Sequence, residues 1–171
     1  MTFLVDSDVD ADRSDAGAPS VRIVADISNS FTYASYQNAI PVLRSIVIEN
    51  PGSGHYAPCK VEVTSSPAFL RPKTWQIDRL APGDILPLSD RRAELDAGYL
   101  AGLNEAERGE ITVRLTCGEE VLDEQVIPVR LLARDEWGGV SDMAQLLPAF
   151  VMPNDPAVSR VLRKAAERLV E

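Results

Sequence analysis

Histidine and cysteine are scarce in this sequence, and each scarcity excludes a class of function. The 171 residues include one histidine and two cysteines. Two cysteines are too few for a disulfide scaffold, and they form no C-x-x-C pair of the kind that binds zinc. One histidine likewise excludes a histidine-rich metal site. We expect His55, in the loop GSGHYAP, to be a surface residue, because no G-x-S-x-G nucleophile motif accompanies it.

Long apolar runs and basic clusters are also missing. No segment approaches the roughly 18 uninterrupted apolar residues of a membrane-spanning helix. The first ten residues, MTFLVDSDVD, lack the basic and apolar regions of a secretory signal, so we expect a cytoplasmic protein without membrane contact. The formal net charge of −9 disfavours a surface that holds phosphate backbones. Without a G-x-x-x-x-G-K-[ST] or G-x-G-x-x-G motif, no nucleotide cofactor is expected.

Aspartate dominates the start of the chain. Five aspartates lie among small residues in VDSDVDADRSDAGAPS (5–20), where little can be buried. A calcium-binding EF-hand loop starting at Asp6 would need glycine at its sixth position and glutamate at its twelfth. These positions hold Ala11 and Gly17. Residues 1–20 are therefore predicted to form a disordered acidic tail.

An alternation of apolar and polar residues with period two begins at Val21 and predicts half-buried strands. Loops rich in glycine, proline and aspartate separate the segments. Seven short strands with no long helical pattern between them are typical of an antiparallel β-sandwich of the immunoglobulin or fibronectin kind, over residues 21–135. Pro128 predicts an edge position or a bulge, since proline cannot donate a backbone hydrogen bond. The seven candidate strands are residues 21–28, 42–49, 59–64, 73–79, 84–88, 111–117 and 124–133.

Residues 136–171 show a helical pattern instead. Ser141 is a candidate cap for a short helix that runs to about Phe150 and is interrupted by Pro148. Asp155 followed by Pro156 predicts the start of a second, amphipathic helix. Its apolar stripe comprises Val158, Val161, Leu162, Ala165 and Leu169. Its cations are Arg160, Arg163, Lys164 and Arg168.

Cys59, Trp75 and Cys117 follow the order of an immunoglobulin core. The tyrosine that usually precedes the second cysteine of such a domain by two residues is replaced by Leu115. In a cytoplasmic protein the thiols stay reduced, and free cysteine is among the most frequently buried residues. We therefore predict two buried, unbridged cysteines.

Carboxylates carry the one enzymatic alternative. Glu105, Glu107 and Glu110 lie in DAGYLAGLNEAERGE (96–110), where NEAER reads as a helical turn capped by Asn104. Paired carboxylates can act as general acid and base, with or without a metal. A small hydrolase using Glu105 with Glu107, or Asp135 with Glu136, would need these groups to converge in a pocket with shifted pKa values.

The stretch LLARDEWGGV (131–140) has a structural interpretation. Leu131 to Ala133 complete the last predicted strand, and Arg134 to Glu136 lead the chain into water. Trp137 is then expected to fix a joint between the strands and the helices, while Gly138 and Gly139 allow the backbone to turn.

Four segments carry a resemblance to a known family. They are PKTWQIDRL (72–80), DAGYLAGLNEAERGEITVRL (96–115), LLARDEWGG (131–139) and LPAFVMPNDPAV (147–158). In this order they resemble the N-terminal region of very large bacterial superfamily I helicase-related proteins, which continue with transglutaminase-like, helicase and Mrr- or Vsr-type endonuclease segments. The resemblance implies a non-catalytic front end of a protein that works on nucleic acid, with DNA defence as the expected context. None of the family's catalytic motifs has a counterpart here.

The sequence thus predicts a docking or scaffolding domain with no catalytic residue, cofactor or metal. Its partner would be a later domain of the parent chain or another protein, and a stand-alone protein-binding module is the related alternative. Direct binding of nucleic acid would have to rest on the four cations of the last helix. The candidate contact surface comprises Trp137, Phe150, Val158, Val161, Leu162, Ala165 and Leu169.

Overall fold

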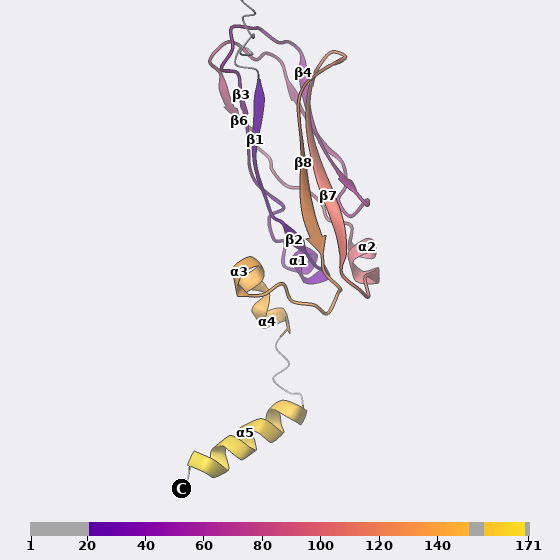
Figure 1. Cartoon of the computed structure of the whole chain (residues 1–171), viewed down its shortest axis with the longest axis vertical. Helices are drawn as coiled ribbons and strands as arrows, with labels where there is room; N and C mark the ends of the chain where they lie inside the picture. Colours follow the sequence, from indigo (N-terminus) through magenta and orange to yellow (C-terminus); the bar gives the residue numbers. More distant parts are fainter. Residues whose placement is uncertain (1–20, 151–155, 170–171) are drawn as a thin grey trace, which may run out of the picture.

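The computed structural model describes residues 21–150 and 156–169, and the expected tail of residues 1–20 lies outside this part. The described chain contains two sheets and several short helices, which confirms the expectation of a mainly β chain (Figure 1). It has eight strands instead of the seven expected. The additional strand is only two residues long, which is too short to show an alternating pattern.

One sheet has three strands in the order β1-β3-β6. Its members are β1 (Arg22–Ile27), β3 (Leu43–Glu49) and β6 (Ile85–Pro87). Both pairings are antiparallel, and β6 covers only the second half of β3, from Val47 to Glu49. The β1 pairing shifts register between Asp26 and Ile27. The first half of β3 therefore lacks a neighbouring strand on the β6 side within the described residues.

The other sheet has five strands in the order β2-β8-β7-β4-β5. Its strands are β2 (Ser30–Phe31), β4 (Cys59–Ser66), β5 (Lys73–Ile77), β7 (Glu107–Cys117) and β8 (Glu120–Leu131). All neighbours are antiparallel except β2, which pairs parallel with β8 at its C-terminal end. β2 reaches only Arg130 and Leu131, so Pro128 lies on a stretch of β8 that it leaves uncovered. This position tolerates the missing N–H of proline.

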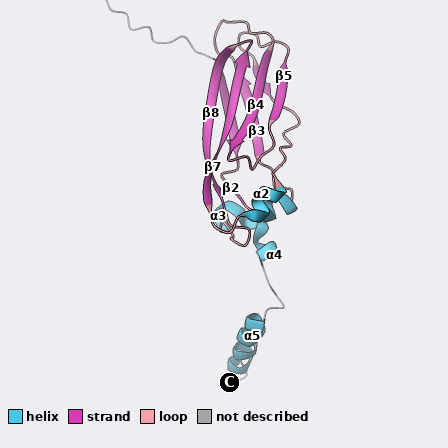
Figure 2. Cartoon of the chain, turned by 90° about the vertical axis from the view of Figure 1, so that its right-hand side faces the viewer, coloured by secondary structure: helices cyan, strands magenta, loops and turns pink. Residues whose placement is uncertain are grey.

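The main hydrophobic core lies between the two sheets, which form two layers in Figure 1 and overlap in the turned view of Figure 2. Ile23, Ile46 and Ile48 are buried in the three-stranded sheet, and Val61 and Val113 are buried in the five-stranded sheet. The alternation of buried and half-exposed residues along β4 follows the predicted period of two. Each such side chain contributes roughly 1.5–3 kcal/mol when removed from water.

Two hydrogen bonds join β1 of one sheet to β8 of the other. The backbone N–H of Ile23 donates to Oδ2 of Asp123 at 2.6 Å. Nε2 of Gln125 donates to the carbonyl oxygen of Ile23 at 2.6 Å. Both backbone groups of a buried residue at a sheet margin are thereby satisfied by side chains.

After β6 the chain leaves the three-stranded sheet and runs beside the other one. The N–H of Leu88 still donates to the carbonyl of Ile46 at 2.9 Å. The indole Nε1 of Trp75 then donates to the carbonyl of Ser89 at 2.9 Å, and Leu95 forms an isolated antiparallel bridge with Leu70. The separation of residues 89–95 from β3 opens the flank of the molecule between the two sheets.

The helices are short except for the last. They are α1 (Tyr33–Gln37), α2 (Ala97–Gly102), α3 (Val140–Met143), a 3-10 turn (Ala144–Leu146), α4 (Leu147–Phe150) and α5 (Pro156–Leu169). No helix in the described ranges is long and apolar enough to cross a membrane.

Two predictions about local helices were wrong. The turn NEAER, predicted to be helical with Asn104 as its cap, includes the start of β7 at Glu107, which pairs with Leu131 of β8. The helix lies earlier, and its cap is Asp96, whose Oδ1 accepts from the N–H of Tyr99 at 2.8 Å. The helix predicted from Ser141 begins instead after Gly139 and is divided by the 3-10 turn. The predicted cap of α5, Asp155, lies outside the described residues.

Cys59, Trp75 and Cys117 follow the order of an immunoglobulin core in the sequence, but all three lie in one sheet of the structure. The two cysteines lie on adjacent strands of one sheet, as direct partners in the pairing of β4 with β7, and Trp75 lies on β5 of the same sheet. Both thiols are free, as predicted. Cys59 is buried, but Cys117 is only half-buried, so the prediction of burial was right for one of the two.

Candidate functional site

The joint at residues 131–140 is organised around Trp137. Its half-buried ring packs against a second hydrophobic cluster formed by Ala34, Leu132, Met143 and Leu146. Its indole Nε1 donates to the carbonyl oxygen of Met143 at 2.8 Å. Because this cluster includes Leu132, which follows the last strand, and Met143 of α3, Trp137 connects the sheets to the helices, as the sequence suggested.

The two glycines after Trp137 allow the chain to turn tightly. Gly139 has a φ of 93°, which side chains other than that of glycine rarely tolerate. A Cβ on Gly138 would lie 3.0 Å from Sδ of Met143 and 3.1 Å from Cδ1 of Leu132. Both glycines therefore have structural roles, and the close approach at Gly138 lets the second cluster form.

The carboxylates of the hydrolase alternative are exposed or serve local contacts. Asp135 is exposed, and Glu136 is half-buried, with an oxygen 3.8 Å from Nη2 of Arg130. Glu105 is exposed, and Glu107 accepts a hydrogen bond from the hydroxyl of Tyr99. Burial and this carboxylate raise the pKa of Tyr99 to about 12. None of these four carboxylates lines either of two pockets in the described part of the chain.

Metal binding and histidine chemistry have no evident site in the described structure. No group of three or more histidine, cysteine or acidic side chains is arranged to hold a metal ion among residues 21–150 and 156–169. His55 is exposed in its loop, where the sequence placed it.

The predicted contact residues separate into two sets. Trp137 and Phe150 are partly buried against the second cluster, so they face inward more than expected. Val158, Val161 and Leu162 on α5 are 38%, 66% and 63% exposed. Ala165 is also exposed. Leu169 belongs to the backbone of α5, but its side chain lies outside the described residues.

The net charge of α5 is positive, whereas that of the whole chain is negative. Four cations and one anion, Glu167, are exposed along the helix. The cations are Arg160, Arg163, Lys164 and Arg168. At about 100° per residue Arg160, Arg163 and Lys164 lie on the side opposite Val158, whereas Arg168 lies beside Val161 at the margin, so α5 combines an apolar face with a basic one.

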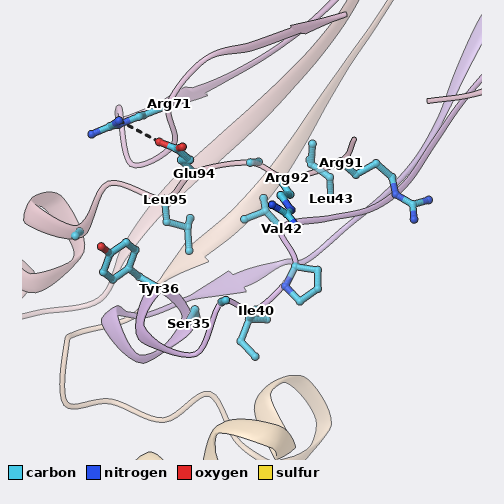
Figure 3. A pocket seen from close by; sticks show the side chains of 14 residues that line it. Ser35, Tyr36, Ile40, Val42, Leu43, Arg71, Arg91, Arg92, Glu94 and Leu95 are labelled. Atoms are coloured by element: carbon cyan, nitrogen blue, oxygen red, sulfur yellow. Dashed lines mark hydrogen bonds and ion pairs between the residues drawn. The ribbon is translucent and has the colours of Figure 1, made fainter. Parts of the chain in front are cut away.

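A groove that the sequence analysis did not predict opens on the flank between the two sheets (Figure 3). Its volume is about 960 Å³. Val42, Leu43 and Leu95 form an apolar floor, and the half-buried Ile40 extends it. The groove lies where residues 89–95 separate from β3. No local sequence signal marks it, because its walls come from segments about 50 residues apart.

Three arginines border this groove. Nη1 of Arg71 donates to Oε2 of Glu94 at 3.0 Å. Glu94 is the only carboxylate among the residues that line the groove. Arg91 and Arg92 are exposed on the same margin, and Figure 3 shows the Arg92 side chain beside Val42 and Leu43. The preceding Asp90 accepts a hydrogen bond from Nζ of Lys73 at 2.9 Å. This contact holds the pKa of Asp90 below its ordinary value.

Comparisons with known proteins add no assignment, since neither a protein-family model nor a curated protein matches the sequence.

Proposed function

We propose that this chain is a non-catalytic docking domain that binds a protein partner through the apolar face of α5. The observation that carries the proposal is the exposure of Val158, Val161 and Leu162 on one face of a 14-residue helix. A contiguous apolar face left in water is unfavourable, and such faces commonly mark binding surfaces. The partner can be a later domain of the same parent chain or a separate protein.

The charges of α5 specify the partner more closely. Arg160, Arg163 and Lys164 give the opposite side of α5 a positive charge in a chain with a net charge of −9. An acidic protein surface with an apolar groove complements this helix, in the mode by which amphipathic helices bind grooves. We propose such a surface as the occupant, in preference to nucleic acid or another copy of this acidic chain.

For the architecture and the cellular context we propose an immunoglobulin-like β-sandwich in a cytoplasmic, helicase-related protein. Two facing sheets with antiparallel pairing, and consecutive strands β1 and β2 that belong to different sheets, support the sandwich. The four segments at 72–80, 96–115, 131–139 and 147–158 support the helicase-related context.

The test is cross-linking from two faces of the same helix in cells that express the full chain. A photo-cross-linking amino acid replaces Val161 on the apolar face or Ser159 on the polar side, and adducts are identified by mass spectrometry. We expect one acidic protein to be captured from position 161 alone. Its purified form should bind the V161D/L162D variant at least about tenfold more weakly than the unchanged chain, a loss of about 1.4 kcal/mol.

The matched control is S159D, which adds charge to the same helix outside the apolar face. Equal weakening by S159D and by V161D/L162D would contradict the proposal, because it would assign the effect to charge alone. Self-association of the pure chain that V161D/L162D abolishes would assign the face to a second copy. Binding of duplex DNA at low salt that depends on Arg160 and Arg163 would assign the helix to nucleic acid.

A further inference from the structure

We propose that the groove between the two sheets binds the chain's own N-terminal segment, residues 1–20. The groove is a different surface from the apolar face of α5, and the ligand proposed for it belongs to the same chain. This proposal rests on the charge and apolar lining of the groove, on the open edge of β3, and on the sequence that precedes Val21.

The groove has the two features that an extended, acidic peptide requires. Its floor presents apolar side chains from Val42, Leu43 and Leu95. Its margin carries Arg71, Arg91 and Arg92 against one carboxylate, so it is locally basic on a chain with a net charge of −9. Arginine binds carboxylates in paired hydrogen bonds, which makes it well suited to capture aspartates.

Arg91 and Arg92 retain the capacity to bind a ligand. Lys73 already neutralises Asp90, and Arg71 already holds Glu94. Arg92 adds a weaker electrostatic contact to Asp90. Among the described residues Arg91 makes no ion pair. At least one guanidinium at the groove is thus available for an added carboxylate.

The backbone of β3 also offers an open edge beside the groove. The pairing of β6 with β3 ends at Val47, and one further hydrogen bond reaches Ile46. Among the described residues, Leu43 to Ser45 therefore have no partner strand on the β6 side of β3. An extended segment placed in the groove can therefore continue the line of β6 and add main-chain hydrogen bonds to β3, a common mode of peptide binding.

The N-terminal sequence has the complementary pattern. In an extended strand, alternate side chains face opposite sides. One face of residues 3–12 would carry Phe3, Val5, Ser7, Val9 and Ala11, and the other would carry Leu4, Asp6, Asp8, Asp10 and Asp12. Such a strand sets apolar groups against the floor of the groove and carboxylates against its arginines.

The length of the segment is sufficient. β1 begins after Val21 and runs six residues to Ile27, which pairs with Leu43 at the groove. The path along β1 and across β3 is on the order of 30 Å at about 3.3 Å per residue and about 4.8 Å per strand. It uses about ten of the twenty residues, which leaves Asp6, Asp8 and Asp10 within reach. Tethering raises the effective concentration of the segment to the millimolar range, so weak contacts suffice.

The test measures backbone hydrogen exchange in the groove of the full-length chain. We expect the amides of residues 42–45 and 91–95 to exchange about tenfold faster or more when Asp6, Asp8, Asp10 and Asp12 are all changed to Asn, because the charge-assisted hydrogen bonds are lost. R91E/R92E should have the same effect. Adding a synthetic peptide of residues 1–20 to the tail variant should restore slow exchange, and adding it to R91E/R92E should not.

Charge reversal distinguishes a specific contact from unfolding. Changing the four aspartates to Lys should speed exchange, and combining that change with R91E/R92E should slow it again. The matched control is R79E, which reverses an exposed arginine outside the groove lining and should leave exchange unchanged. Unchanged exchange in both the tail and groove variants would overturn the proposal. Equal effects of R79E and R91E/R92E would also overturn it, as would fast exchange in the tail variant that the peptide of residues 1–20 does not slow.

Discussion

Trp137 and Met143 form a closed turn in which an indole Nε1 donates to a backbone carbonyl 2.8 Å away, six residues further along the chain. The same ring packs against the second cluster, which includes Leu132 immediately after β8. One side chain thereby connects the sheets to α3 by a hydrogen bond and by apolar contact.

The contributions of this contact can be separated by two substitutions. W137F keeps most of the apolar contact and removes the hydrogen bond, so it should lower the free energy of unfolding by about 0.5–1.5 kcal/mol. W137A removes both and should cost more, though less than the about 3–5 kcal/mol of a fully buried tryptophan, because Trp137 is half-buried. Denaturant unfolding followed by circular dichroism measures both values. Equal costs for the two variants would mean that packing contributes nothing.

Asp123 should be important for attaching β1 to the other sheet. D123A leaves the N–H of the buried Ile23 without its acceptor and should cost about 1–3 kcal/mol. D123N keeps an acceptor oxygen and should cost less. E119A, at an exposed position in the turn before β8, is the control and should be close to neutral. Chemical denaturation of the three variants decides the order, and a cost for D123A no larger than that for E119A would refute the role.

Cys117 should react with alkylating reagents much faster than Cys59 in the folded protein. Cys59 is 1% exposed, and burial, followed by the contact with Cys117, raises its pKa to about 12. The thiolate is the reactive form, so Cys59 remains unreactive near pH 8. Mass spectrometry of peptides after brief iodoacetamide treatment should find label on Cys117 alone, and on both residues in denaturant. Equal labelling in the native state would contradict the burial of Cys59.

The raised pKa of Cys59 also predicts a pH dependence of stability. The unfolded chain loses this proton near the ordinary thiol pKa, whereas the folded chain holds it up to about pH 12. Stability is therefore fully present below the unfolded pKa and falls as the pH rises toward 12, by at most about 1.4 kcal/mol per pH unit for one proton. C59V should flatten this slope in urea titrations at pH 8–10.5. A slope identical to that of the unchanged chain would exclude Cys59 as its source.

Gly109 should not tolerate even a methyl group. A Cβ there would lie 3.1 Å from Cε1 of Phe69 and 3.2 Å from Cδ1 of Leu131, both fully buried. G109A should therefore lower stability by about 1–3 kcal/mol, despite the entropy that alanine recovers in a strand. G102A at the end of α2, where a Cβ meets nothing within 4 Å, is the control and should be neutral or stabilising. Thermal unfolding compares the two variants.

Alternation along the chain was sufficient to predict the strands that have one face in the core. The predicted ranges 42–49 and 59–64 fall within a residue or two of β3 and β4. The prediction failed where pairing outweighs local preference. Glu105, Ala106 and Glu107 favour a helix, yet Glu107 pairs with Leu131 and begins β7, because an eleven-residue ladder with β8 outweighs the small helix propensities.

The surfaces were predictable to different degrees. The apolar stripe of α5 is a local pattern, and Val161 and Leu162 are exposed on it. Trp137 was correctly associated with the joint, but its packing against Leu146 required knowledge of the folded chain. The groove was missed because Val42 and Leu95 become neighbours only after residues 89–95 separate from β3.

The parallel pairing of β2 with β8 determines how the domain would bear a mechanical load. The chain enters this pair through β1 and leaves it after Leu131. When the two flanking segments are pulled apart, parallel strands slide lengthwise, so the bonds from Arg130 to Asn29 and from Leu132 to Phe31 are strained together instead of opening one after another. The attachments of Ile23 to Asp123 and Gln125 carry part of the same load. Resistance to force is therefore concentrated where β1 and β2 meet β8. The rate of unfolding under tension measures this resistance.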